Sequence, residues 1–131
     1  MGLVVRLVKD LRNDPCIRHI ILGGHQISHQ IRRYVDRWDE KTIVVNGQGE
    51  IVFRSLLQHL TARTELAPQK GISFYRDGEL CDGGEAAMLT NLDLIPSPYL
   101  SGHFDKMRYP VTSFETNRGC PYKCTFCTWG G

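Results

Sequence analysis

The chain has 131 residues, enough for one ordinary domain or parts of two, but too few for a complete eight-fold β/α barrel of roughly 200 residues or more. Hydrophobic residues make up 41% and charged residues 23%, a balance typical of a globular protein and not of a disordered one. The formal net charge of +2 gives no electrostatic reason to expect a nucleic acid or an anionic membrane as a partner.

The N-terminal segment is apolar at helical spacing over residues 3–11, which predicts an amphipathic helix that ends at residues 13–15, Asn-Asp-Pro. Arg6 and Lys9 interrupt its apolar character, so it is neither a signal peptide nor a membrane span. We therefore expect a cytoplasmic protein.

Two short apolar segments, 17–22 and 42–45, each lead into a glycine turn and are predicted to be strands. Amphipathic helices are predicted after each turn, over 27–38 and from Glu50 to residue 60. The apolar residues of the last helix that we expect to face inward are Ile51, Phe53, Leu56, Leu57 and Leu60. This alternation predicts an α/β fold with parallel strand pairing. Because two strands cannot form an independent doubly wound sheet, we expect the first half of the domain to be missing.

The pattern changes beyond residue 63. Residues 71–76 alternate, Asp77-Gly78 is a hairpin turn signal and 79–81 read as the return strand, which together predict a small appendage. Residues 82–110 are rich in glycine and proline and predict an ordered linker. A third strand is predicted over 111–116, and the loop after it carries three cysteines at a strand end where α/β proteins bind ligands.

The cysteine trio is Cys120, Cys124 and Cys127, whose spacing C-x3-C-x2-C lets one short loop wrap three thiolates around a single centre. Structural zinc sites need four protein ligands, whereas three ligands leave one metal position open for a small molecule, which favours catalysis. From spacing alone, zinc with Cys81 or His103 as a fourth ligand is a competing interpretation.

The segment ETNRGCPYKCTFC, residues 115–127, resembles the cluster-binding loop of the radical S-adenosylmethionine (radical SAM) enzymes. The resemblance implies that Cys120, Cys124 and Cys127 hold a [4Fe-4S] cluster whose fourth iron binds S-adenosylmethionine. It also implies that Phe126 lies near the adenine. In that family the reduced cluster cleaves S-adenosylmethionine to a 5′-deoxyadenosyl radical, so an electron donor such as flavodoxin or ferredoxin is an expected partner.

The two glycine turns, taken alone, are what any strand-to-helix connection needs. With the helix after the second turn and the later segment IPSPYLSGHFD, they resemble the C-terminal half of the cobalamin-binding, Rossmann-like domain that precedes many radical SAM barrels. The resemblance implies that they line the groove for the nucleotide tail of cobalamin. The candidate cobalamin-binding residues are Gly23, Gly24, Gly47, Gly49 and Glu50.

Two features depart from that family. Gln48 stands where an acidic residue is usual, and the motif D-x-H-x-x-G, which supplies a histidine ligand to cobalt in some relatives, does not occur in the chain.

Gly83-Gly84-Glu85 resembles the family's methionine-binding GGE motif but precedes the cluster loop, so we do not assign it that role. His25 and His29 are four residues apart, and exposure or helix capping is favoured over a metal site for them.

The resemblance implies three parts: the C-terminal part of a cobalamin-binding domain over 1–63, a hairpin and linker over 64–110, and the start of a radical SAM domain over 111–131. The expected fold is a partial doubly wound parallel sheet, followed by a linker and the first strand of a β/α barrel. We expect no turnover from this fragment alone. A non-catalytic cobalamin- or metal-binding module and a zinc-stabilised interaction fragment are the alternatives, and methyl transfer, ring rearrangement and oxidative cyclisation all stay open as reactions.

Overall fold

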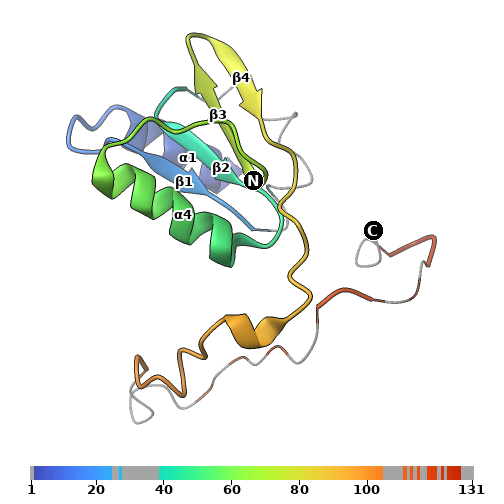
Figure 1. The fold of residues 1–131 in the computed structure, drawn as a ribbon. Coiled ribbons are helices and arrows are strands. Elements are labelled where there is room, and N and C mark those ends of the chain that lie inside the picture. Colours follow the sequence, from blue (N-terminus) through green and yellow to red (C-terminus); the bar gives the residue numbers. More distant parts are fainter. Residues whose placement is uncertain are drawn as a thin grey trace. The chain divides into compact units, whose positions relative to one another are not determined.

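The computed structural model of the chain describes residues 2–24, 27, 39–104, 111, 113, 115, 118–120, 122 and 124–127. The chain divides into two compact units, Met1–Leu94 and Ile95–Gly131. In the first unit, helices α1 (Gly2–Arg12) and α4 (Gly49–Ala62) lie on the two sides of a four-stranded sheet (Figure 1). Within the described residues, no helix is both long enough and apolar enough to cross a membrane.

The sheet is built from β1 (Ile20–Leu22), β2 (Thr42–Val45), β3 (Ile72–Arg76) and β4 (Glu79–Asp82), in that spatial order. β1 and β2 pair in parallel, as predicted, whereas β2–β3 and β3–β4 are antiparallel. The sheet is therefore mixed, and the prediction of a parallel sheet is correct for its first two strands only.

The antiparallel direction of β3 follows from the path of the chain after α4. α4 leads back toward the start of β2, and residues 64–71 then return the chain to the other end of that strand. There Gly71 accepts a hydrogen bond of 2.8 Å from the backbone N–H of Asn46, directly after β2. β3 thus begins where β2 ends and runs in the opposite direction.

The hairpin signal at Asp77-Gly78 is confirmed. Both residues have positive φ, 51° and 78°, as a two-residue type I′ turn requires. The hairpin is not a separate appendage, however, because β3 pairs with β2 and extends the same sheet.

The structure extends the predicted helices by one or two residues at each end, to Gly2–Arg12 for α1 and Gly49–Ala62 for α4, and the predicted limits of β2 are correct. β1 begins at Ile20, later than the predicted residue 17, because the backbone N–H of Ile17 donates to the carbonyl of Asp14 in a turn. Of the predicted helix over 27–38, only Ile27 is among the described residues, and it is helical and buried.

The core lies between α4 and the sheet. Leu56 is fully buried there, and Val52 and Leu60, one turn away on either side, pack against the same cluster of Ile43, Val45, Leu66, Ile72 and Phe74. The predicted inward face is correct for Leu56 and Leu60. It is wrong for Ile51, Phe53 and Leu57, each 41% exposed, because the stripe that contacts the sheet follows the i, i+4 spacing of residues 52, 56 and 60.

The second unit contains no regular helix or strand at its described residues. The rings of Tyr99 and Phe104 lie 5.3 Å apart, and the Tyr99 hydroxyl donates to the carbonyl of Ser113 at 3.0 Å. Of the predicted strand 111–116, the described residues Val111, Ser113 and Glu115 are not in a strand. A strand is defined by hydrogen bonds to a neighbouring strand, and the described chain provides no such neighbour for this segment.

Candidate functional site

The two glycine turns meet at one edge of the sheet. Gly23-Gly24 follows β1 and Gly47-Gln48-Gly49 follows β2, and parallel strands end at the same edge. Gly23 lies beside the last residue of β2, since a Cβ built on it would be 3.6 Å from the carbonyl oxygen of Val45. The structure thus brings together the turns that the sequence separates by about twenty residues.

The turn after β2 is closed by the chain itself. Gly47 has φ +77°, and a Cβ on it would lie 3.1 Å from the backbone nitrogen of Ala86. The same Ala86 N–H donates to the carbonyl of Asn46 at 3.1 Å, and the Leu89 N–H donates to the side-chain oxygen of Gln48 at 2.8 Å. The fold therefore requires glycine at position 47 for its positive φ and its close contact with Ala86, whether or not a cofactor binds.

Glu50 lies in the first turn of α4, at the same edge. A carboxylate there is stabilised by the positive end of the helix dipole. Gly24 has φ +98°, a conformation that favours glycine, and no atom of the described residues lies within 4 Å of a Cβ built on it.

Sequence reasoning missed a buried polar group at this edge. Asn46 is 2% exposed, and its side chain is hydrogen-bonded to Ser73 of β3. The sequence feature that could have identified Asn46 is an asparagine at the end of an apolar strand, directly before a glycine turn. Its partners could not be found from the sequence, because they depend on the pairing of β2 with β3.

The cysteine loop carries Cys120, Cys124 and Cys127, which are exposed and form no disulfide. The Cys127 N–H donates to the Cys124 carbonyl at 3.0 Å, which makes residues 124–127 a tight turn. Before the first cysteine, Gly119 has φ +75° and the Arg118 guanidinium pairs with Glu115 at 2.9 Å.

The three thiols are not gathered into a ready-made site, since no group of three or more His, Cys, Asp or Glu among the described residues is placed to hold a metal. Cysteine ligands commonly come together only when the metal binds, because the metal supplies the attraction that gathers them. The donor set itself, three exposed cysteines outside any disulfide on one short loop, suits a thiophilic metal or an iron–sulfur cluster. Phe126, the predicted adenine contact, is 90% exposed.

The proposed fourth zinc ligands have other surroundings. Cys81 packs against the core of the sheet, and the His103 ring is 2.7 Å from the Ser101 hydroxyl.

Gly83 is required by packing, because a Cβ on it would collide with the carbonyl of Gln69. His25 and His29 lie outside the described residues.

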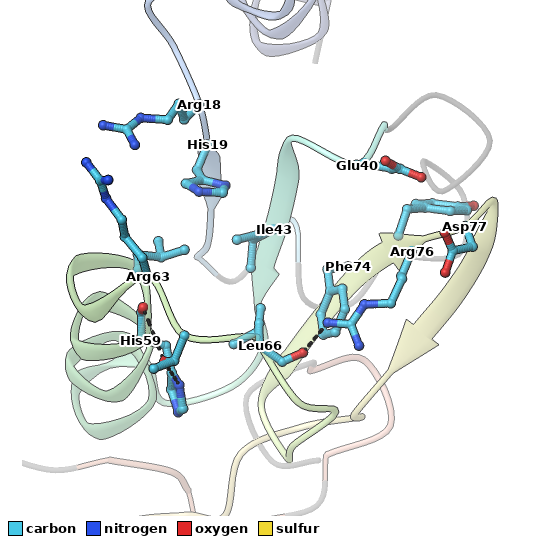
Figure 2. A pocket seen from close by; sticks show the side chains of 13 residues that line it. Arg18, His19, Glu40, Ile43, His59, Arg63, Leu66, Phe74, Arg76 and Asp77 are labelled. Atoms are coloured by element: carbon cyan, nitrogen blue, oxygen red, sulfur yellow. Dashed lines mark hydrogen bonds between the residues drawn. The ribbon is translucent and has the colours of Figure 1, made fainter.

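A cavity of about 490 Å³ lies at the opposite, amino edge of β1 and β2 (Figure 2). Figure 2 shows Arg18 and Arg63 at one side of it and Glu40 and Asp77 at the other. Arg76, also in its lining, is already paired with Glu65 at 2.8 Å. None of the predicted cofactor-binding residues lines this cavity, and its mixed charges select no ligand.

The chain resembles the cobalamin-binding radical SAM proteins over nearly its whole length. It is 32% identical over 97% of its residues to the cobalamin-dependent radical SAM methyltransferase TokK of Streptomyces tokunonensis. It is 33% identical over 97% to the 2-(S-pantetheinyl)-carbapenam-3-carboxylate methyltransferase of Streptantibioticus cattleyicolor. It is also 25% identical over 95% to the anaerobic magnesium-protoporphyrin IX monomethyl ester cyclase of a Synechocystis species.

These similarities confirm the resemblance found in the sequence: the chain is similar over nearly its whole length to radical SAM cobalamin proteins. The chain spans 20% of the length of each of the two methyltransferases and 26% of the cyclase. No protein-family model matches it.

Proposed function

We propose that the chain handles cofactors for a cobalamin-dependent radical SAM methyltransferase. The observation that supports this most strongly is the similarity of 32–33% over 97% of the chain to two proteins named as methyltransferases, one of them cobalamin-dependent. The cysteine spacing C-x3-C-x2-C agrees with it.

In this proposal Cys120, Cys124 and Cys127 hold the [4Fe-4S] cluster. Bound there, the cluster supplies one electron for reductive cleavage of S-adenosylmethionine, which its open iron position binds. The chain's own contribution is to present three thiolates on a short loop, with Phe126 between the second and third cysteines as an apolar surface for the adenine.

Cobalamin is proposed to bind at the carboxyl edge of β1 and β2. Open α/β sheets bind ligands outside the carboxyl ends of their strands, and both glycine turns lie there. The backbone of Gly23 and Gly24 permits close approach of the nucleotide tail, whereas the Gly47 backbone is already approached by Ala86.

The cluster assignment is tested by reconstituting the chain with iron and sulfide without oxygen. Cys120→Ser, Cys124→Ser and Cys127→Ser are each expected to lose bound iron and sulfide and the visible absorption of the cluster. Cys16→Ser, also an exposed free cysteine, is the matched control and is expected to retain both. Retention of the cluster by any of the three loop variants, or its loss in the control, would contradict the assignment.

Methyl transfer is favoured over cyclisation as the reaction of the whole protein, because the two methyltransferases are more similar to the chain than the cyclase is. The test is the fate of the methyl group. A longer protein that contains this chain is expected to transfer label from methyl-labelled S-adenosylmethionine to its substrate.

A further inference from the structure

Asn46 occupies a buried position at the edge where the two glycine turns meet. It follows the last residue of β2, precedes Gly47, and is 2% exposed. Its backbone is fixed on both sides, because its N–H donates to Gly71 and its carbonyl accepts from Ala86. The Asn46 backbone is therefore held on both sides, and its side chain is buried.

A chain of hydrogen bonds fixes the orientation of the Asn46 amide. Its Nδ2 lies 2.8 Å from the Ser73 hydroxyl, which in turn lies 2.8 Å from Oδ1 of Asp82. The Asp82 carboxylate can only accept, so Ser73 must donate its single hydroxyl proton to it and accept from Asn46. The backbone N–H of Gly84 donates to the same Asp82 oxygen at 3.0 Å and holds the carboxylate in place.

This order commits the amide nitrogen of Asn46 to Ser73 and leaves its amide oxygen as the remaining acceptor. On the other side of β2 lie β1 and the Gly23-Gly24 turn. Among the described residues this buried oxygen has no hydrogen-bond donor. A buried acceptor without a donor is costly to the folded state, which indicates that it is satisfied when something binds.

We propose that the Asn46 side-chain oxygen accepts a hydrogen bond from a primary amide of the bound corrinoid, and that Ser73 and Asp82 act as positioning residues for it. This inference rests on the proposed cobalamin site. Cobalamin carries primary amides around the rim of its ring, and each offers two N–H donors. A fixed acceptor at the carboxyl edge selects an amide and rejects a carboxylate, which has no proton to donate.

The test measures the affinity of the full 131-residue chain for cobalamin, by the change in the corrinoid absorption spectrum on binding. Asn46→Leu has a similar volume and no acceptor, and it is expected to weaken binding about fivefold to tenfold, the loss of one hydrogen bond. Ser73→Ala removes the group that orients the amide and is expected to weaken binding to a smaller extent. Thr42→Val is the matched control, because Thr42 is equally buried in β2 but bonds to Asp39 at the opposite edge.

The ligand supplies a second, independent measurement. For the unaltered chain, hydrolysis of the contacted amide to a carboxylate is expected to weaken binding, and this preference is expected to disappear in Asn46→Leu. Comparison of the monocarboxylic derivatives of cobalamin identifies that amide even if Asn46→Leu does not fold, because Ser73→Ala reduces the same preference.

The outcomes separate this inference from the proposed function. If the unaltered chain binds cobalamin, and a folded Asn46→Leu binds it within twofold of the unaltered chain, the inference is wrong and the cobalamin site stands. Equal affinities of the unaltered chain for cobalamin and all of its monocarboxylic derivatives also overturn the inference. If the unaltered chain does not bind cobalamin, both proposals fail. Equal weakening by Thr42→Val assigns the effect to general destabilisation and contradicts the role of Asn46.

Discussion

The backbone N–H of Leu89 donates a hydrogen bond of 2.8 Å to the side-chain oxygen of Gln48, 41 residues earlier in the chain. Gln48 is the residue before the first residue of α4, and its own side chain does not cap that helix. Its side chain instead ties the segment after the sheet to the glycine turn.

Gln48→Ala is therefore expected to loosen residues 86–89 from the turn. The loss of one partly buried hydrogen bond corresponds to about 0.5–1.5 kcal/mol. Faster amide hydrogen exchange at Leu89 would report it directly. Gln48→Glu keeps an oxygen acceptor and is the control, with exchange at Leu89 expected to stay close to that of the unaltered chain.

Gly47→Ala is expected to destabilise the fold more than Gly78→Ala. Both glycines have nearly the same φ, +77° and +78°, but a Cβ meets the backbone of Ala86 at position 47 and nothing within 4 Å at position 78. The backbone strain of about 1–2 kcal/mol is common to both substitutions, so the difference isolates the steric contact. Urea unfolding measures both, and equal losses would show that Ala86 does not press on Gly47.

Leu56→Ala is expected to lower the free energy of unfolding by about 2–5 kcal/mol, because this side chain is completely buried between α4 and the sheet. Leu57→Ala removes the same atoms from a side chain that is 41% exposed on the same helix. It is expected to cost clearly less. Denaturant unfolding of the two variants compares them, and similar losses would mean that the core of α4 is not where the structure has it.

The features predicted correctly from the sequence are those determined locally. The helical spacing of apolar residues identified α1 and α4, and Asp77-Gly78 identified the hairpin because a type I′ turn needs positive φ at both positions. The edge shared by the two glycine turns also followed from the strand order, since parallel strands end together.

The features that the sequence did not reveal depend on contacts between distant residues. β3 joins β2 because residues 64–71 cross back along the sheet, and nothing in their composition predicts that path. The hydrogen bond of Asn46 to Ser73 joins residues 27 apart and follows from that pairing. The cysteine spacing was visible in the sequence, but among the described residues the three thiols do not form a group placed to hold a metal.

The central claim is that the cysteine loop holds a redox-active cluster with an open position for S-adenosylmethionine. The most direct measurement is the electron paramagnetic resonance spectrum of the reconstituted, reduced chain, recorded with and without S-adenosylmethionine. We expect a [4Fe-4S] signal that changes on its addition and is absent from Cys124→Ser. A chain that retains zinc and shows no such signal, or a signal that S-adenosylmethionine leaves unchanged, would contradict the account.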